Sequence, residues 1–339
     1  MASLPFLSVI MPVRNEGAII RESLEAVLAQ DYGQDRMEIF VVDGMSTDDT
    51  RGIVLSMQSR FPNITLLDNP RKIVPAGMNI ALRRAKGEIL VRVDGHCTIA
   101  RDYVRRCVEH LENDGVDGVG GPVHTVGSTR VARVIALAMS SKFGVGGSAF
   151  RTIADRTMLA DTVPFPAYTR AIVQKAGPYD EELVRNQDDE YNYRLRKLGA
   201  KLLLASDVRS EYYSRSSLRS LWRQYFQYGY WKVRVLQKHP LQMSARQFVP
   251  AALVASILAA AALCVLLPAA GLLALGAIVT AYAGANVLAS LLTARGGDRD
   301  VLPLLPLTFA AIHFSYGLGF LRGLVKFRNR WGDQPSLQW

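Results

Sequence analysis

The sequence predicts an α/β domain with a mostly parallel sheet, followed by a membrane region of apolar helices. Up to about residue 215, short β-type runs alternate with segments of helical hydrophobic period, as in parallel sheets with crossover helices. Several of these runs end on acidic residues, which places polar groups at one edge of the sheet. Residues 248–325 are almost uncharged apart from a short break at residues 295–300, and such runs are long enough to cross a bilayer.

The N-terminal elements follow one another in a regular order. Apolar runs that stop at turn residues predict strands, and apolar residues spaced by three and four predict helices. The predicted strands are 7–11, 38–42, 64–67 and 88–93, and the predicted helices are 18–30, 49–60 and 75–85. Ser46 and Thr47 precede the second helix, and we expect them to cap it.

The middle of the chain is rich in glycine. After a predicted helix at 102–113, glycines recur through residues 118–147, which predicts loops. Such loops either surround a ligand or are ordinary connections, and spacing alone leaves both interpretations open. A further helix at 188–198 and a strand at 201–205 complete the predicted domain.

Charge and hydropathy divide the chain into four expected parts. These are a cytoplasmic domain at 1–215, an amphipathic interfacial helix region at 216–245, a membrane domain at 246–325 and a basic tail at 326–339. The net charge is +10, and Lys and Arg are concentrated just before the apolar region. A basic stretch beside apolar spans predicts contact with an anionic cytoplasmic leaflet rather than with nucleic acid, for which no motif occurs.

The membrane region contains three apolar segments, at 248–267, 271–292 and 301–325. The first two are expected to form a tight hairpin. The third carries prolines, His313 and Arg322. A third full span would place the basic tail outside, against the positive-inside tendency. We therefore expect the third segment to be re-entrant or interfacial, with a third span as the alternative.

Two further features limit the compartment. The first 25 residues lack a basic segment followed by a long apolar run, so we expect no signal peptide. The three cysteines have no paired spacing, so neither a disulfide framework nor a zinc site is expected.

The strand at 88–93 ends on Asp94-Gly95-His96. A strand that stops in this way presents a carboxylate and an imidazole, both of them metal ligands, at the carboxyl edge of the sheet. The strand at 38–42 likewise ends on Asp43. Because parallel strands end at the same edge, we expect these side chains to lie near one another.

Four motifs occur in a fixed order, at residues 9–16 (VIMPVRNE), 41–48 (VVDGMSTD), 76–79 (AGMN) and 94–96 (DGH). Together they resemble the family 2 glycosyltransferases of the GT-A fold, over about 230 residues. Within that family, the chain is similar to the membrane-bound, succinoglycan-type bacterial glucosyltransferases. The resemblance implies a Rossmann-like, mostly parallel mixed sheet with flanking helices, and a nucleotide-sugar donor.

The resemblance also implies which residues hold the donor. Asp43 is expected to accept a hydrogen bond from the base, commonly uracil, since Ser46 and Thr47 are expected to cap the helix instead. The full set of expected donor residues in this domain is Pro12, Arg14, Asn15, Glu16, Asp43, Gly77, Asn79 and Asp94.

The leaving diphosphate gains negative charge as the sugar is transferred, and a divalent cation neutralises that charge. The family pattern for the metal site is Asp-x-Asp, but here His96 replaces the second carboxylate. Imidazole suits later first-row metals, whereas Mg²⁺ prefers oxygen. We therefore expect Asp94 and His96 to bind Mn²⁺ at least as well as Mg²⁺. The alternative is a histidine that binds no metal.

An inverting transferase also needs a base for the acceptor hydroxyl. The family has a Glu-Asp-x-Asp/Glu segment followed by Arg, and here it reads Gln187-Asp188-Asp189-Glu190 with Arg194. The resemblance makes Asp188 the base, and Gln187 and Asp189 its neighbours in the catalytic segment. The alternative is an acidic helix start favoured by the helix dipole.

Two further groups come from the resemblance. Processive synthases of the family carry Gln-x-x-Arg-Trp on an interfacial helix, but residues 224–228 lack the Arg and Trp. Residues of this helix that are still expected to close over the diphosphate are Arg223, Gln224, Trp231 and Lys232, unless they form a belt facing the membrane. The residues expected to shape the acceptor pocket are Gly146, Gly147, Arg151, Tyr168 and Arg170.

The expected function is that of an inverting hexosyltransferase in exopolysaccharide or related glycan assembly. It would move one sugar, expected to be glucose, from a UDP-sugar to a lipid-linked (polyprenyl diphosphate) saccharide at the cytoplasmic face of a bacterial inner membrane. The alternatives are a polyprenyl-phosphate sugar synthase, whose phosphate acceptor needs no base, and a processive synthase, for which the apolar segments are few.

Overall fold

The computed structural model describes residues 4–295 and 299–332, and the chain divides into two compact units. Within the described residues, the first unit comprises 4–124 and 149–212, and the second comprises 125–148 and 213–332. The α/β architecture with C-terminal apolar helices is confirmed. We describe each unit by itself.

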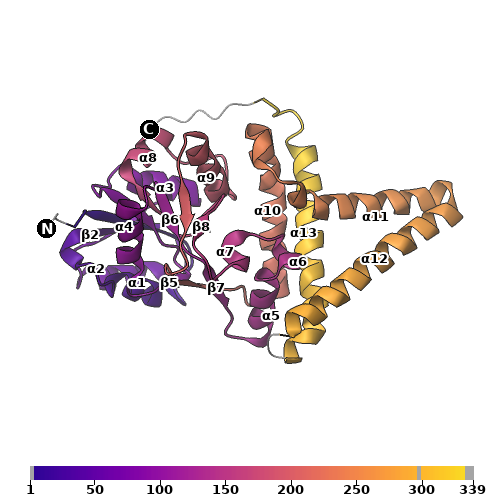
Figure 1. Cartoon of the computed structure of the whole chain (residues 1–339), viewed down its shortest axis with the longest axis horizontal. Helices are drawn as coiled ribbons and strands as arrows, with labels where there is room; N and C mark the ends of the chain where they lie inside the picture. The colour runs from indigo at the N-terminus through magenta and orange to yellow at the C-terminus, as the bar shows by residue number, and fades with distance from the viewer. Residues whose placement is uncertain (1–3, 296–298, 333–339) are drawn as a thin grey trace. The chain divides into compact units, whose positions relative to one another are not determined.

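An eight-stranded sheet forms the centre of the first unit (Figure 1). Its strands, in their order across the sheet, are β3 (Ile64–Asp68), β2 (Met37–Asp43), β1 (Leu7–Val13), β4 (Ile89–Arg92), β9 (Ala167–Thr169), β6 (Gly118–Gly120), β10 (Leu202–Leu204) and β8 (Met158–Leu159). The first four strands are mutually parallel, whereas β9 is antiparallel to both of its neighbours. The sheet is therefore mixed and mostly parallel, as predicted.

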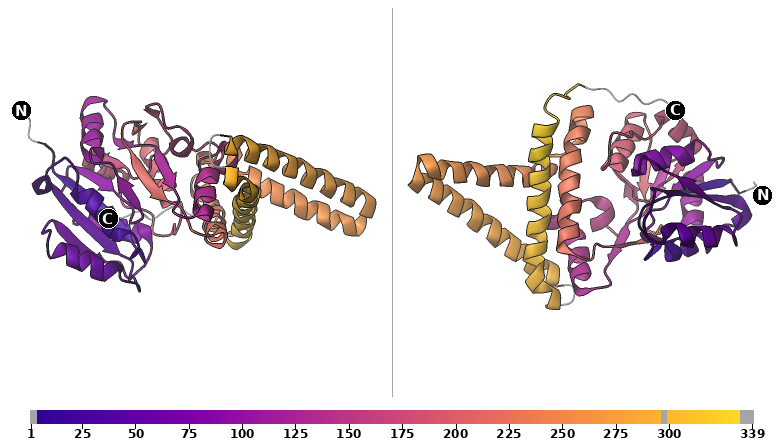
Figure 2. Two further views of the ribbon diagram at one scale, coloured as in Figure 1. Left: turned by 90° about the horizontal axis from the view of Figure 1, so that it is seen from below. Right: turned by 180° about the vertical axis from the view of Figure 1, so that it is seen from behind.

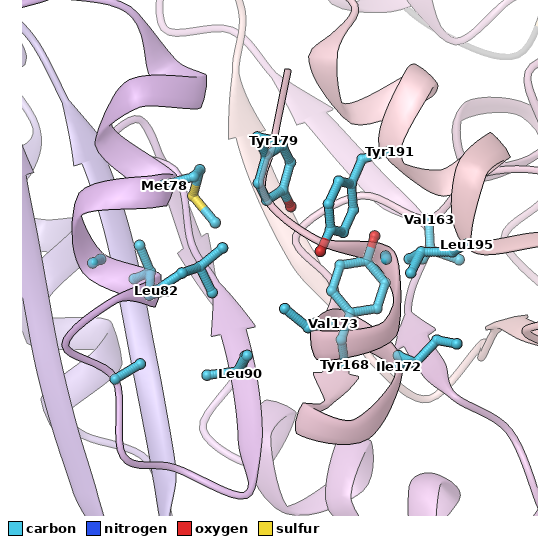
Figure 3. Packing of buried hydrophobic residues seen from close by; sticks show 14 of the residues in the cluster. Met78, Leu82, Leu90, Val163, Tyr168, Ile172, Val173, Tyr179, Tyr191 and Leu195 are labelled. Atoms are coloured by element: carbon cyan, nitrogen blue, oxygen red, sulfur yellow. The ribbon is translucent and has the colours of Figure 1, made fainter. Parts of the chain in front are cut away.

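Helices cover this sheet and connect its strands. They are α1 (Ile20–Leu28), α2 (Thr50–Gln58), α3 (Val74–Leu82), α4 (Tyr103–Asn113), α7 (Ala149–Thr152), α8 (Arg170–Ala176) and α9 (Gln187–Lys197), with a 3₁₀ turn η1 (Gln34–Arg36). One face of the sheet packs against α3, α8 and α9 in a continuous apolar core that includes three tyrosines (Figure 3). Burial of this face, more than helix propensity, accounts for the stability of these short helices.

Pro12 lies inside β1, a central strand, where a proline normally removes a hydrogen bond. Pairing of β1 with β4 stops at Ile10, whose carbonyl accepts from the Val93 N–H. Residues 10 and 12 face the same side, so the missing N–H of Pro12 falls where β4 has already ended. The strand can therefore continue along β2 to Val13.

The sequence did not predict several short strands. A second, three-stranded sheet has the order β5 (Cys97–Ile99), β11 (Ser210–Tyr213) and β7 (Val123–Val126). The segment expected to be glycine-rich loop contains β6 and β7, and a ten-residue helix, α5 (Arg130–Met139). The expected cap of α2 was also wrong, because that helix begins after Asp49 and Ser46 bonds elsewhere.

The second unit is helical (Figure 2). Besides α5 it contains α6 (Lys142–Val145), α10 (Leu218–Lys238), α11 (Val249–Leu266), α12 (Pro268–Ala294) and α13 (Leu305–Lys326), with 3₁₀ turns η2 (Pro240–Gln242), η3 (Ala245–Gln247) and η4 (Arg299–Leu304). Helices α10 and α13 run in parallel and very close together. A Cβ added at Gly319 would meet the Phe226 carbonyl at 2.1 Å, and one at Gly323 would meet the Tyr230 carbonyl at 2.6 Å. Only glycine permits this approach.

Helices α11 and α12 form the expected hairpin, which projects away from the α10–α13 pair (Figure 2). Three segments are long and apolar enough to cross a membrane, by length and composition: 249–266, 268–294 and 300–326. The hairpin segments are 17% and 6% buried within the protein, whereas the third segment is 50% buried. The third segment contains one continuous helix, α13, against the re-entrant form of our expectation.

Candidate active site

The carboxyl ends of β1, β2 and β4 meet at one edge of the large sheet, because the three strands are parallel neighbours. The chain leaves these ends at Arg14, Gly44 and Val93. Glu16, Asp43 and Asp94 are therefore carried to the same edge, as the sequence predicted. In open α/β sheets this edge is where ligands bind.

Two loops at this edge are joined by hydrogen bonds. The Asn15 N–H donates to Ser46 Oγ at 2.8 Å, and Asn15 Oδ1 accepts from the Thr47 N–H at 2.8 Å. Asn15 has a φ of 55°, a left-handed conformation that Asn tolerates better than most residues. The Glu16 N–H donates to Thr50 Oγ1 at 2.8 Å. Pro12 lies in β1, and Arg14, Asn15 and Glu16 follow it in a loop that these hydrogen bonds hold in place.

Asp43 is fully buried at the end of β2. Its carboxylate accepts from the Ser46 hydroxyl at 2.5 Å, from the Ser46 N–H, and from Arg51 Nη1 at 2.9 Å. We expected Ser46 to cap a helix and leave Asp43 free; instead Asp43 ties down the loop. For Asp43 to contact a nucleotide base, this buried cluster must open.

Asp94 is held by a buried arginine two residues earlier. Arg92 Nε donates to Asp94 Oδ1 at 2.8 Å and Nη2 donates to Oδ2 at 3.2 Å. Burial favours the neutral form of Asp94, but the charges of Arg92 and His96 outweigh this and hold the pKa of Asp94 below its ordinary value. Asp94 is therefore an anion, with 19% of its side chain exposed.

His96 is oriented by Glu16. Its Nδ1 lies 3.0 Å from Glu16 Oε1, and its ring meets Tyr212 edge-on, with 5.0 Å between centroids. A carboxylate on one imidazole nitrogen is the usual support for a histidine that binds metal through the other. This arrangement suits His96 as a ligand, and it gives Glu16 a role in positioning that the sequence did not predict.

The protein alone offers few ligands for a cation. Across residues 4–295 and 299–332, no group of three or more His, Cys, Asp or Glu side chains could hold a metal ion. Asp94 and His96 fit a cation that takes its remaining ligands from a bound diphosphate, which is how Mg²⁺ and similar ions are often held.

The start of α9 carries the expected catalytic segment. Asp188 is exposed in the first turn, and its Oδ1 accepts from the Asp189 N–H at 2.9 Å. Asp189 is half-buried. Gln187 is 5% exposed, and its Oε1 has no hydrogen-bond partner among the described residues. Burial opposes the charge of Arg92, but Asp94 first and then Asp188 hold the pKa of Arg92 above its ordinary value.

Asn79 and Gly77 lie on α3 and are buried. The Asn79 amide donates to the Tyr179 carbonyl at 2.9 Å and to Glu181 Oε1 at 2.8 Å, and its Oδ1 accepts from the Tyr179 N–H at 2.8 Å. These bonds fasten the 179–181 turn to α3. The Asn79 side chain is thus engaged by protein rather than free for a nucleotide.

The expected acceptor residues of the first unit have different roles. Tyr168 lies in the tyrosine core and donates to Asn192 Oδ1 at 2.7 Å (Figure 3). Arg170 binds the carbonyls of Gly87 and Ala85, so it stabilises a turn. Burial and these bonds argue against an acceptor pocket at both residues. Arg151 is half-buried, with its guanidinium over the Tyr212 ring at 5.4 Å.

The remaining expected residues belong to the second unit. Gly146 and Gly147 both have positive φ, and the Gly147 carbonyl accepts from Arg246 Nη1 at 2.9 Å. On α10, Arg223 is exposed and Lys232 is buried. Gln224 Nε2 donates to the Tyr228 hydroxyl at 2.9 Å, and Trp231 Nε1 donates to Gln227 Oε1 at 3.1 Å.

The sequence did not predict two charged residues at the site, Arg92 and Arg185. Arg92 falls within an apolar run and was taken as part of a strand. Arg185 is exposed in the loop before α9, and its charge also lowers the pKa of Asp94. Arg92 could have been recognised from the alternation of side chains along β4. This alternation places the charged Arg92 on the same face as the buried Leu90.

Comparison with known proteins identifies the family. The profile described as "Glycosyl transferase family 2" matches residues 8–176. The chain is 32% identical to the succinoglycan biosynthesis protein ExoA of Rhizobium meliloti (strain 1021) over 326 residues, which cover 95% of this chain and 96% of that protein. The chain belongs to glycosyl transferase family 2. This confirms the family resemblance inferred from the motifs.

The transferase is also similar to other proteins at lower identity. It is 29% identical to a Methanococcus voltae enzyme named dolichyl N-acetyl-alpha-D-glucosaminyl phosphate 3-beta-D-2,3-diacetamido-2,3-dideoxy-beta-D-glucuronosyltransferase, over 69% of this chain and 74% of that one. Among solved structures, the mannosyltransferase PcManGT from Pyrobaculum calidifontis, in complex with GDP-Man and Mn²⁺, has a TM-score of 0.61 at 21% identity, covering 96% of this chain and 88% of that one. S. aureus TarS 1-349 with UDP-GlcNAc has a TM-score of 0.52 at 18% identity, covering 96% and 92%. At these identities the likeness concerns the fold.

Proposed function

We propose that the transferase is an inverting enzyme that moves one sugar, glucose, from a UDP-sugar to a lipid-linked saccharide in exopolysaccharide assembly. The observation that carries the proposal is the Asp94 carboxylate at the carboxyl edge of the sheet, aligned by Arg92, beside a His96 ring that is oriented by Glu16. Similarity to ExoA over nearly the whole chain supports the exopolysaccharide role, and the name of the Methanococcus relative supports a lipid-linked acceptor.

The roles of the residues follow from their chemistry. The loops at residues 14–17 and 43–50 receive the nucleotide at the ends of β1 and β2. Asp94 and His96 would hold Mn²⁺ or Mg²⁺ together with the diphosphate, and the cation would neutralise charge on the leaving group. Asp188 takes the proton of the acceptor hydroxyl as that oxygen attacks the sugar from the face opposite the diphosphate.

We place the catalytic unit on the cytoplasmic side of the inner membrane, where nucleotide-sugars are made. The basic residues of α10 and the largely exposed apolar hairpin α11–α12 support this placement. The glycine segment at 146–147 and the α10 residues Arg223, Gln224, Trp231 and Lys232 are proposed to complete the acceptor and diphosphate sites.

The Asp188→Asn variant tests the proposal. Membranes that contain the protein would be incubated with lipid extract and labelled UDP-glucose, and the lipid product would then be extracted. Parallel incubations would use other labelled nucleotide-sugars. General-base loss typically costs about 10²–10⁴-fold in rate. We expect a loss of that size in Asp188→Asn, with UDP affinity by calorimetry unchanged. Asp155→Asn, an exposed acid of the same unit, is the matched control and should transfer normally.

The alternative outcomes are distinct. A phosphate acceptor is already a nucleophile and needs no base. Undiminished transfer by Asp188→Asn to polyprenyl phosphate would therefore indicate a polyprenyl-phosphate sugar synthase. Products from a sugar nucleotide other than UDP-glucose would overturn the donor assignment alone.

A further inference from the structure

Arg92 is an unusual residue for its place in the fold. It ends β4, and side chains two residues apart on a strand share a face, so Leu90 and Arg92 point the same way. Leu90 packs in the core under the tyrosines (Figure 3). Arg92 is only 8% exposed, which places a guanidinium where the strand pattern calls for an apolar side chain.

Arg92 and Asp94 form a bidentate contact. Nε and Nη2 of Arg92 donate to different oxygens of Asp94, at 2.8 and 3.2 Å. This planar fork restrains the direction of the carboxylate as well as its position, which a lysine at the same place would not do. The Asp94 side chain therefore has one strongly preferred orientation before any ligand arrives.

Stability alone is a weak reason for such a pair. Taking two ions out of water is costly, and replacing a buried ion pair with apolar residues is often neutral or stabilising. The pair is more readily explained by the need for Asp94 at this edge. Arg92 is the group that holds the Asp94 carboxylate in one orientation there.

Arg92 also interacts electrostatically with Asp188, the expected base. Burial disfavours its charge, yet Asp94 first, and then Asp188, hold the pKa of Arg92 above its ordinary value. The guanidinium is thus permanently charged and within electrostatic reach of both the expected cation ligand and the expected base. No proton or bond changes on Arg92 itself during transfer.

We propose that Arg92 is a positioning residue of the transfer reaction: its forked hydrogen bonds fix the Asp94 carboxylate in the orientation that the donor diphosphate and its cation require. The inference rests on the proposed function. Charge grows on the diphosphate as the sugar leaves, and the cation that Asp94 would help to hold neutralises that charge. A carboxylate that is free to rotate would hold this cation less well, and the loss would be larger in the transition state than in the ground state. A displacement of about 1 Å in such a group can cost about 10²-fold in rate.

The test uses three variants of the full-length protein in membranes. Arg92→Lys keeps the charge without the fork, Arg92→Met keeps the volume without the charge, and Arg92→Ala opens space for free guanidinium. We expect kcat to fall about 10–100-fold in Arg92→Lys and further in the other two, with donor KM changed by less than about threefold. Millimolar guanidinium should raise the kcat of Arg92→Ala several-fold.

Arg234→Ala is the control for the loss of a buried arginine, because Arg234 is fully buried and donates to Gln237 Oε1 at 2.6 Å and to the Arg330 carbonyl at 2.9 Å. It should lower the midpoint of thermal unfolding, while the kcat of the folded protein stays unchanged with or without guanidinium. Wild-type kcat in Arg92→Met would overturn the inference, as would a loss in Arg92→Ala that tracks unfolded protein and is not rescued. If Arg92→Ala does not fold, the kcat and KM of Arg92→Lys decide. Absence of transfer by the wild type would instead overturn the proposed function.

Discussion

Two side chains without a carboxyl group occupy places in the site where the family motifs have acids. His96 stands for the second carboxylate of Asp-x-Asp, and its Nδ1 is held by Glu16. Gln187 stands for a glutamate, and at 5% exposure a carboxylate there would be buried with no cation bonded to it. With Arg92 forked onto Asp94 as well, the site has less negative charge than the motif alone implies.

The His96→Asp variant should change the metal preference of the transferase. Replacing imidazole with a carboxylate supplies an oxygen ligand, which Mg²⁺ prefers, and removes the nitrogen ligand that favours Mn²⁺. We expect the ratio of rates in Mn²⁺ to rates in Mg²⁺ to fall about tenfold. Initial rates and calorimetric metal affinity with UDP present are the measurements.

Glu16→Ala is the companion variant, since loss of a carboxylate behind a metal-binding histidine typically weakens affinity about 10–100-fold. Its Mn²⁺ affinity should drop without a change in preference. A metal preference in His96→Asp identical to that of the wild type would remove His96 from the metal site.

The sequence located this site better than it assigned individual roles. Asp94 and His96 were predictable because strand ends converge at one edge. The contacts that engage Asp43, Asn79 and Tyr168 were not predictable, because their partners are set by tertiary packing. Asn79, for example, binds the backbone of a residue one hundred positions later in the chain.

At the level of elements, α4 is joined to the loop before β11 through His110. Its Nδ1 lies 2.6 Å from Asp114 Oδ2 and its Nε2 lies 2.9 Å from Asp207 Oδ1, while Arg106 approaches the other oxygen of Asp207 at 3.8 Å. Both ring nitrogens must carry protons to satisfy both carboxylates. Burial opposes this charge, but the two acids raise the pKa of His110 above its ordinary value.

This network predicts a pH-dependent contribution to stability. Because the pKa of His110 is higher in the folded than in the unfolded protein, its contribution is complete below the unfolded value of about 6.5 and is lost as pH rises through the folded value. His110→Gln should therefore lower the thermal unfolding midpoint at pH 6, with a difference that shrinks toward pH 8.5. A difference that stays constant over that range would contradict the prediction.

The helices and strands that the sequence predicted are those in which apolar residues recur with a clear period. Strands β1–β4 and helices α1–α4 repeat apolar residues over five or more positions in most cases, so local pattern was sufficient. Strand β6 has three residues, two of them glycine, and becomes a strand by pairing with β9 and β10, some fifty and eighty residues later. Such strands are products of the assembled sheet rather than of local sequence.

At the scale of the whole molecule, the number of membrane spans follows from the pairing of α10 with α13. Helix α10 carries five Lys or Arg residues and cannot lie in the hydrocarbon core: Arg219, Arg223, Lys232, Arg234 and Lys238. Helix α13 runs beside it in glycine-mediated contact, and Arg234 donates to the Arg330 carbonyl at 2.9 Å. We therefore propose that α13 lies at the interface with α10 and that the hairpin α11–α12 alone spans the bilayer.

Two spans leave the catalytic unit and the residues after α13 on the same side of the membrane, and three spans separate them. Labelling of single introduced cysteines, in a Cys264→Ser background, distinguishes these cases. The two remaining native cysteines, Cys97 and Cys107, should not react, because burial raises the pKa of their thiols. With an impermeant maleimide on intact spheroplasts, we expect Ala269→Cys, at the hairpin turn, to be labelled. Arg328→Cys and the reference Asp155→Cys should be labelled only after permeabilisation. Labelling of Arg328→Cys in intact spheroplasts would show that α13 crosses the membrane, because only a third span carries that residue to the outer face.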